Sequence, residues 1–349
     1  MEFLKKFISG VMFLFVCFAS VFSVSLVMPK NTVLANRTES SFKTASENSE
    51  NKNKIKSADG LKENSSAEQK NNSSQKNEVE TAAKATVKGK ISEEVLSPYS
   101  ANLSYNKIYI KNSTGLKVDL KKELETPIKF KIAKSKEPQV LIVSTHTTES
   151  YMLEDRNYYT SKDATGSTDK TKNVVFIGSV IKKQLEENGI VCVQSDTIHD
   201  HPQFSGSYNR SAQTIKSYLK KYPSVKVVLD IHRDSVNNND GTKIKPTVTL
   251  NGKKAAQVML VSGCMAGEVE NFPNWRENFR LAIRLQQNME VNYPSLARAV
   301  TFTPRRYNQN LTTGSLLLEI GTEANTLSEA AYSASLVGKC LSNVLNNLH

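Results

Sequence analysis

The sequence contains few cysteines, and their positions exclude two common uses of this residue. Of the 349 residues only four are cysteine, Cys17, Cys192, Cys264 and Cys340, and no two of them have C-x-x-C spacing. Cys17 lies in an apolar N-terminal segment, so the other three can form at most one disulfide bond. A framework of disulfides and a cysteine metal site of the usual spacing are both excluded.

Motifs that recognise nucleic acid are also missing, although the chain is strongly basic. The formal net charge is +12, which fits an anionic partner such as nucleic acid, a membrane surface or an anionic cell envelope. The sequence has no RNP-type aromatic motif, no zinc-finger spacing and no basic helix. We therefore expect no nucleic-acid partner.

The N-terminal residues predict where the chain is located. Lys5 and Lys6 precede an apolar stretch, residues 7–28, which is long enough to span a bilayer and longer than a usual signal-peptide core. We expect residues 1–35 to be an uncleaved transmembrane anchor. A signal segment cleaved after residues 33–35 is the alternative. Because the two lysines hold the N-terminus inside, the remainder is extracytoplasmic in either case.

A polar tract follows this segment. Residues 36–90 contain no proline, no cysteine and one aromatic residue, Phe42, in a background of Ser, Asn, Lys, Glu and Gln. Such a composition cannot bury enough apolar area to offset the entropy of ordering the chain. We predict a disordered polar linker over residues 36–96, which would let a domain at residues 97–349 reach some distance from the membrane.

Strand patterns alternate with amphipathic helix patterns from residue 97 onwards. The alternation predicts an α/β fold with a largely parallel twisted sheet flanked by helices. Active sites of such sheets lie beyond the carboxyl ends of the strands. The expected strands are residues 107–111, 138–146, 190–196, 225–232, 255–263, 298–303 and 314–321, and the expected helices are residues 118–125, 173–189, 208–222, 274–293 and 326–348.

Three expected strands end in side chains that can bind a metal or move a proton. His146 ends "PQVLIVSTH", His232 ends "VKVVLDIH", and Glu319 lies near the end of "GSLLLEIG". In a parallel sheet the three would share one edge, and two histidines with a carboxylate are a usual ligand set of catalytic zinc. His146 and Glu149 could bind from one turn, together with His232, and Glu319 would then be the general base. Taken singly, a strand-end histidine is more often a satisfied polar group than a ligand.

Four segments together resemble a known protein family. "PQVLIVSTHTTESY", "SYNRS", "VVLDIHRDS" and "LLLEIGTEANT" are similar to the stage II sporulation protein P family, the membrane-anchored cell-wall amidases of forespore engulfment. The resemblance implies an amidase-like fold, a Zn2+ cofactor and cleavage of the N-acetylmuramoyl-L-alanine amide of peptidoglycan, with peptide cross-links as a second substrate. It also implies a partner, the lytic transglycosylase stage II sporulation protein D, and a location between the mother-cell and forespore membranes.

The resemblance assigns residues, with two departures. His232 matches the second zinc histidine, and Glu319 in "EIG" matches the catalytic glutamate. The family often reads "HTH" where residues 144–146 read "STH". The wider zinc amidases also take their ligand glutamate from the start of the first helix, where this chain offers only Thr171. Glu149 is therefore the better candidate for the third ligand.

Five further polar residues are weaker candidates. Asp230 and Asp234 share a strand face with the second histidine and could orient its ring, although a surface-loop role suits Asp234 nearly as well. Arg210 and Arg233 could clamp a stem-peptide carboxylate or form structural ion pairs. His199 could line the substrate cleft or be a neutral loop residue.

Together these observations predict a zinc-dependent peptidoglycan hydrolase acting in sporulation. Two alternatives stay open: a zinc metallocarboxypeptidase acting on stem peptides, and a zinc-free scaffold that binds the wall and recruits other hydrolases. The missing histidine at position 144 keeps the scaffold interpretation open.

Overall fold

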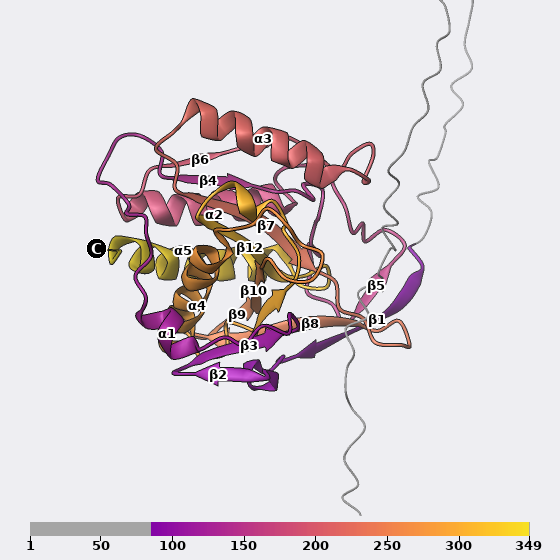
Figure 1. Cartoon of the computed structure of the whole chain (residues 1–349). Helices are drawn as coiled ribbons and strands as arrows, with labels where there is room; N and C mark the ends of the chain where they lie inside the picture. The colour runs from indigo at the N-terminus through magenta and orange to yellow at the C-terminus, as the bar shows by residue number, and fades with distance from the viewer. Residues whose placement is uncertain (1–84, 349) are drawn as a thin grey trace, which may run out of the picture. The chain divides into compact units, whose positions relative to one another are not determined.

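An eight-stranded sheet forms the centre of the part of the chain that the computed structural model describes, residues 85–348 (Figure 1). The expected anchor and most of the expected linker lie outside these residues. Within them, no helix is long and apolar enough to cross a membrane. The strand order is β2 (Leu103–Tyr105), β3 (Ile108–Asn112), β11 (Val300–Thr303), β10 (Val258–Gly263), β12 (Gly314–Thr322), β7 (Val227–Asp234), β4 (Val140–Val143) and β6 (Cys192–Gln194).

The sheet is largely parallel, as the sequence predicts. β12, β7, β4 and β6 run parallel to one another. β10, β11 and β3 form a second parallel set that meets the first where β10 lies antiparallel to β12. The strand β2 pairs antiparallel with β3 at the edge. β12 and β7, which carry two of the candidate residues, therefore lie side by side in the middle of the sheet.

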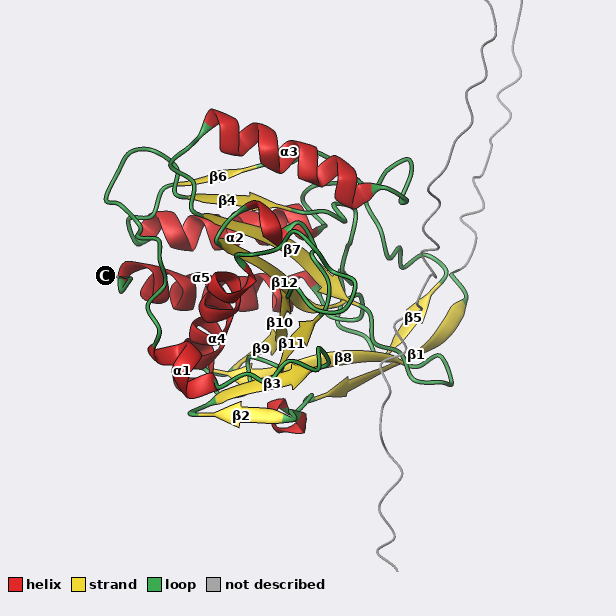
Figure 2. Ribbon diagram, in the orientation of Figure 1, coloured by secondary structure: helices red, strands yellow, loops and turns green. Residues whose placement is uncertain are grey.

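All five expected helices are present, and they cover both faces of the sheet (Figure 2). On one face α2, α4 and α5 share a single apolar core with the strands, and α3 covers part of the opposite face. Asn173 caps the start of α2, and Thr326 forms a capping box with Glu329 at the start of α5. The helices are α1 (Leu120–Glu125), α2 (Val174–Glu187), α3 (Ser207–Lys221), α4 (Trp275–Asn292) and α5 (Leu327–Asn346), with short 3-10 turns at Pro98–Ser100 and Gln309–Leu311.

β4 shows why several strands have continuous apolar sequences. Val140 and Ile142 point into the core shared with α2 and α5, whereas Leu141 and Val143 point towards Ile215 of α3. Because both faces are covered, every residue of the strand is buried. The strand ends at Val143, earlier than the expected end at residue 146, and a turn follows.

A second, four-stranded sheet was not predicted. Its order is β5 (Tyr158–Thr160), β1 (Val87–Glu94), β8 (Lys243–Leu250) and β9 (Lys253–Ala256). The linker was predicted to reach residue 96, but β1 occupies residues 87–94, so the prediction is wrong there. Ile91 is the only buried residue of that strand, so its own pattern is weak, and pairing with the distant β5 and β8 holds it in place. Pro246, which lowers strand propensity, similarly concealed β8.

The expected strand at residues 255–263 is in fact two strands in different sheets. Gln257 separates β9 from β10, and its buried side-chain amide bonds the backbone of Leu96 and Ser295. A polar residue at the junction lets the chain leave one sheet and enter the other with its hydrogen bonds satisfied. The three cysteines in the described residues are all buried and unpaired, so the one disulfide that the sequence allowed is not formed there.

Candidate active site

Adjacent strands bring His232 and Glu319 directly opposite each other. The parallel register of β7 and β12 pairs Glu319 with His232. Alternation along β7 places Asp230 and His232 on the same face as Val228, which belongs to the apolar cluster of α3. His232 is 2% exposed and Glu319 is 8% exposed. Two motifs that are distant in sequence thus form one nearly buried polar centre on the α3 face.

A buried aspartate of β7 binds the turn that follows β4. Asp230 accepts one hydrogen bond from the backbone N–H of Thr145 and a second from its hydroxyl, both 2.7 Å long. The turn carries His146, whose imidazole centre lies 5.3 Å from that of His232, with the rings nearly perpendicular at 81°. The third strand end therefore reaches the same centre as the other two.

Glu149 and Asp230 flank the two nitrogens of the His232 ring. Oε2 of Glu149 lies 3.4 Å from Nδ1 and accepts a hydrogen bond from the backbone N–H of Arg233. Oδ1 of Asp230 lies 3.0 Å from Nε2, close enough for an ion pair but not aligned for a hydrogen bond. One carboxylate thus stands on each side of the ring, as in sites where a second carboxylate orients a histidine ligand.

These carboxylates decide the charge of the metal-free centre. Burial alone would lower the pKa of His232, but Asp230 and Glu149 raise it well above its usual value. Burial would raise the pKa of Glu149, but the His232 hydrogen bond and charge, together with the Arg233 guanidinium, hold it below its usual value. Without a metal, a proton on His232 offsets part of the negative charge of these two carboxylates. A bound cation would replace that proton.

His146 differs from His232 because aromatic rings, not carboxylates, surround it. Its ring stacks on Phe204 at 4.4 Å with the planes 9° apart, and Tyr208 meets it edge-on at 5.5 Å. Burial, and then the charge of His232, lower the pKa of His146, so the neutral form is favoured. Its Nδ1 atom is buried and has no hydrogen-bond partner. A neutral imidazole with a free, buried nitrogen is the state that a metal ligand requires.

The nitrogen and oxygen atoms of the candidate ligands are of the types that zinc binds, and one pair of them also has a suitable separation. Zinc holds imidazole nitrogen and carboxylate oxygen at about 2.0–2.2 Å, so tetrahedral ligand atoms lie roughly 3.4 Å apart. Nδ1 of His232 and Oε2 of Glu149 already have that separation. Among the described residues, however, three ligand-type atoms come within 4.8 Å of one another only at Glu93, Asp155 and Glu329. His146 must therefore shift relative to this pair when a metal binds.

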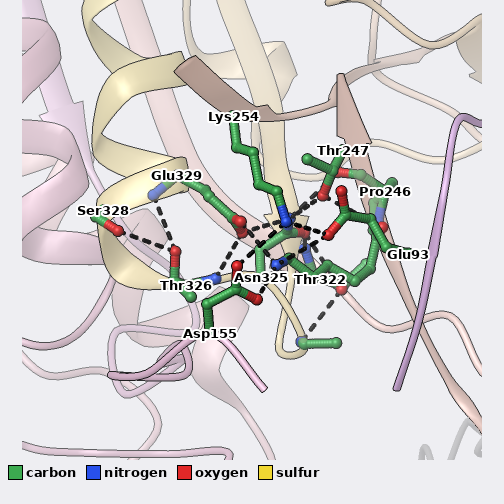
Figure 3. A network of polar contacts seen from close by, with 12 residues as sticks. Glu93, Asp155, Pro246, Thr247, Lys254, Thr322, Asn325, Thr326, Ser328 and Glu329 are labelled. Carbon is green, nitrogen blue, oxygen red and sulfur yellow. Dashed lines mark hydrogen bonds and ion pairs between the residues drawn. The ribbon is translucent and has the colours of Figure 1, made fainter. Parts of the chain in front are cut away.

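The glycine of the "EIG" motif has a structural reason. Gly321 has a left-handed φ of 67°, and the register between β12 and β7 shifts between Glu319 and Thr322. A Cβ at Gly321 would lie 2.7 Å from Oδ1 of Asn325 and 2.9 Å from Cβ of Ala256. The Asn325 oxygen accepts the backbone N–H of Thr322, closing the turn (Figure 3). Only glycine fits there, and the turn fixes the strand end that carries Glu319.

Two lysines occupy the acidic cluster of Glu93, Asp155 and Glu329. Nζ of Lys245, whose side chain is 2% exposed, lies 2.6 Å from Asp155 and 2.7 Å from Glu329. Nζ of Lys254 lies 2.7 Å from Glu93 and 3.2 Å from Asp155 (Figure 3). The cluster therefore has its own cations, and we assign it to holding β1, β8 and β9 against the start of α5, not to binding a metal.

His199 and Arg210 have structural contacts, one of the two roles that the sequence left open for each. His199 is buried, with Nδ1 bonded to the carbonyl of Ser144 and Nε2 to the hydroxyl of Thr214. Because a carbonyl only accepts, Nδ1 carries a proton and donates it to Ser144. Neither nitrogen is free to bind a metal or line a cleft. The guanidinium of Arg210 donates to the carbonyls of His199, Gln203 and Ser205 and to the hydroxyl of Ser207, so it holds the loop before α3 in place.

Arg233 and Asp234 are likewise engaged with the protein. The Arg233 guanidinium donates to the carbonyls of Ser150 and Thr165, and its backbone N–H binds Glu149, so it positions the segment that carries Glu149. Asp234 pairs with Arg298 at 2.7 Å, and it is Asp230 that contacts the His232 ring, at 3.0 Å. Of the five weaker candidates, Asp230 contacts the ring of His232, and Arg233 contacts Glu149 through its backbone N–H.

Three residues of the centre were missed by sequence reasoning, and all come from one loop and the helix after it. Asp200 is buried and accepts the backbone N–H and the hydroxyl of Thr148, in the turn that carries His146 and Glu149. Phe204 and Tyr208 contact the His146 ring. The loop follows a strand that ends at the same edge of the sheet as the candidate ligands, and this position was the one indication in the sequence. Residue type alone did not distinguish these side chains from ordinary loop residues.

Comparison with known proteins establishes the family. The sequence matches the family described as stage II sporulation protein P over residues 20–342. The chain belongs to the stage II sporulation protein P family. A curated relative, stage II sporulation protein P of Bacillus subtilis (strain 168), is 30% identical over 216 residues, which cover 59% of this chain and 50% of the relative. The chain thus spans about half the length of that curated member of the stage II sporulation protein P family.

Among solved structures, this member of the stage II sporulation protein P family is similar to several amidases at low scores. The N-acetylmuramoyl-L-alanine amidase AmiC2 of Nostoc punctiforme is 14% identical, covers 60% of this chain and 96% of its own, and has a TM-score of 0.36. The CwlD amidase of Clostridioides difficile, solved with the GerS lipoprotein, is 12% identical, with 59% and 96% coverage and a TM-score of 0.33. Ami1 of Mycobacterium abscessus is 13% identical, with 59% and 97% coverage and a TM-score of 0.32.

Proposed function

We propose that this domain is a zinc-dependent peptidoglycan hydrolase that acts in sporulation and cleaves the amide between the lactyl group of N-acetylmuramic acid and L-alanine. One observation carries the proposal. In a chain of the stage II sporulation protein P family, His232 and Glu319 stand opposite each other on adjacent strands, with His146 and Glu149 on the neighbouring turn.

His146, Glu149 and His232 would hold the zinc ion. Their donor atoms are of the kind zinc selects, and the unpartnered Nδ1 of His146 supports the assignment. Asp230 orients the His232 ring, and the N–H of Arg233 orients the Glu149 carboxylate. When bound, zinc would polarise the scissile carbonyl and make the attacking water more acidic.

Glu319 would move the proton. Its carboxylate stands opposite His232 in the register of two buried strands, so the sheet and not a mobile loop holds it in place. Glu319 accepts the proton of the attacking water and then donates it to the leaving amine, because cleaving an amide needs both transfers. The same two transfers would serve hydrolysis of peptide cross-links, the second activity that we propose.

Replacing Glu319 by Gln tests this assignment. The amide is nearly isosteric with the carboxylate but cannot accept a proton at neutral pH. We expect zinc content and folding near wild type, with turnover on purified sacculi lower by at least ~10²-fold. The matched control is Glu149→Gln, which should lose zinc as well as activity because it removes a ligand.

The outcomes separate the alternatives. If Glu319→Gln loses zinc and Glu149→Gln keeps it, the roles of the two glutamates are reversed. A wild-type protein that binds no zinc would favour the wall-binding scaffold. Mass analysis of the digest identifies the bond, since free stem peptides with intact glycan indicate an amidase, whereas release of terminal D-alanine alone indicates a carboxypeptidase.

We further propose a location and a partner for this activity. The apolar stretch at residues 7–28 and the polar tract after it support a tethered, extracytoplasmic domain between the mother-cell and forespore membranes. Membership of the stage II sporulation protein P family supports cooperation with a lytic transglycosylase, stage II sporulation protein D. Co-purification of the two proteins from membranes of sporulating cells would test the partnership, and its absence after cross-linking would contradict it.

A further inference from the structure

The proposed zinc centre holds its two histidines by different means. His232 lies between two carboxylates, Glu149 and Asp230. His146 has no such partner at Nδ1, and its closest ring contacts are aromatic. A histidine ligand usually donates its second N–H to a carboxylate, a carbonyl or water, which fixes the plane of its ring. Nδ1 of His146 is the nitrogen left free for the metal, so the aromatic contacts on its ring are the side-chain contacts that can hold the ring plane.

Phe204 and Tyr208 meet the ring from two directions. Phe204 stacks on one face, 4.4 Å away and 9° from parallel, and Tyr208 presents its edge at 88°. Stacked and edge-on arrangements are the preferred geometries of aromatic pairs. A parallel stack resists tilting of the imidazole but allows it to slide within its own plane. A shift of the ring within its own plane would therefore keep the contact with Phe204.

The loop that carries Phe204 is itself fastened in place. Arg210 donates hydrogen bonds to the carbonyls of His199, Gln203 and Ser205. Ser207 at the start of α3 donates to the carbonyl of Phe204. The loop is thus bonded on both sides of a phenylalanine that is 61% exposed. An exposed ring contributes little to the core, so its rigid placement over His146 calls for another reason.

We propose that Phe204, supported by Tyr208, is a positioning residue that holds the His146 imidazole in the plane required for zinc binding. The inference rests on the proposed function, because it assumes that His146 is a zinc ligand. Phe204 touches neither substrate nor metal in this role and acts only through His146. Its exposure is useful experimentally, since removing a ring that lies outside the core should leave the fold intact.

Phe204→Leu in the full chain tests the proposal, with Phe204→Tyr as the conservative variant and Tyr105→Leu as a control. Tyr105 is also exposed, at 38%, but lies on the edge strand β2. The first readout needs no zinc: the ring-proton NMR signals of His146 in the metal-free protein, assignable because the chain has five histidines. Stacking on Phe204 shifts these signals upfield, and Phe204→Leu should abolish that shift while Phe204→Tyr keeps it.

The second readout is the zinc dissociation constant, measured by competition with a chelator. Phe204→Leu should weaken zinc binding by roughly 2- to 10-fold, the value of one aromatic pair. Phe204→Tyr and Tyr105→Leu should stay near wild type. If the ring signals change but the dissociation constant does not, Phe204 does not position the ligand, and a rise in KM alone would make it a substrate contact. If the wild-type protein binds no zinc, the proposed function fails and this inference fails with it.

Discussion

Replacing Gly321 tests quantitatively whether the end of β12, which carries Glu319, requires a glycine. Its left-handed backbone, with φ of 67°, would cost an alanine about 1–2 kcal/mol. The new Cβ would also lie 2.7 Å from Oδ1 of Asn325. That side chain cannot easily withdraw, because its amide nitrogen lies 3.2 Å from acceptors on Pro246, Thr247 and Glu329. Overpacking of this kind adds about 1–3 kcal/mol.

Gly241→Ala is the matched control for this substitution. Gly241 also has a left-handed φ, 83°, but a Cβ there would have no neighbour within 4 Å. The control therefore isolates the backbone term of about 1–2 kcal/mol, whereas Gly321→Ala should lose about 2–5 kcal/mol in total. Urea unfolding followed by far-UV circular dichroism measures both free energies of unfolding.

Activity provides a second readout for the same pair of variants. Under conditions where both remain folded, Gly321→Ala should lose turnover on sacculi because Glu319 is displaced, while its zinc content stays near wild type. Gly241→Ala should keep its turnover. If Gly321→Ala is no less stable than Gly241→Ala, the close contact with Asn325 is not present in solution, and the structural reason given for the "EIG" glycine is refuted.

Two further predictions concern charged side chains. Lys245→Met should lower the free energy of unfolding in urea by about 3 kcal/mol, because it leaves the buried carboxylate of Glu329 without its cation. Lys254 is exposed, so Lys254→Met should cost less than about 1 kcal/mol. Equal losses would contradict the assignment of Lys245 as the buried cation of this cluster. Burial would raise the pKa of Asp163, but hydrogen bonds from Thr160 and Arg156 hold that pKa below its usual value. The ionised carboxylate therefore stabilises the fold at pH values above the unfolded pKa of about 3.9. The stability gap between wild type and Asp163→Asn should thus be constant near neutral pH and shrink as the pH falls below about 4; a gap that widens in acid would refute the sign.

The sequence by itself determined seven of the eight strands of the main sheet and its helices, and missed only the edge strand β2. Continuous apolar runs such as residues 140–143 indicate strands covered on both faces, and amphipathic runs such as residues 174–187 indicate helices that pack on them. The signals are local, so the type of each element could be read without its partners. The same logic located His146, His232 and Glu319, because each follows or ends an apolar run at the carboxyl edge of a strand.

Only the tertiary structure decided the second sheet and the roles of the polar residues. β1 has a single buried residue and β8 contains a proline, so both strands depend on partners that are distant in sequence. Arg210 and His199 were natural candidates for a cleft, but their donors are taken by backbone carbonyls that folding brings close. A side chain's chemistry can be read from its type, whereas the groups that satisfy it are set by contacts between distant segments. The stack of Phe204 on His146 could not be found in the sequence for the same reason.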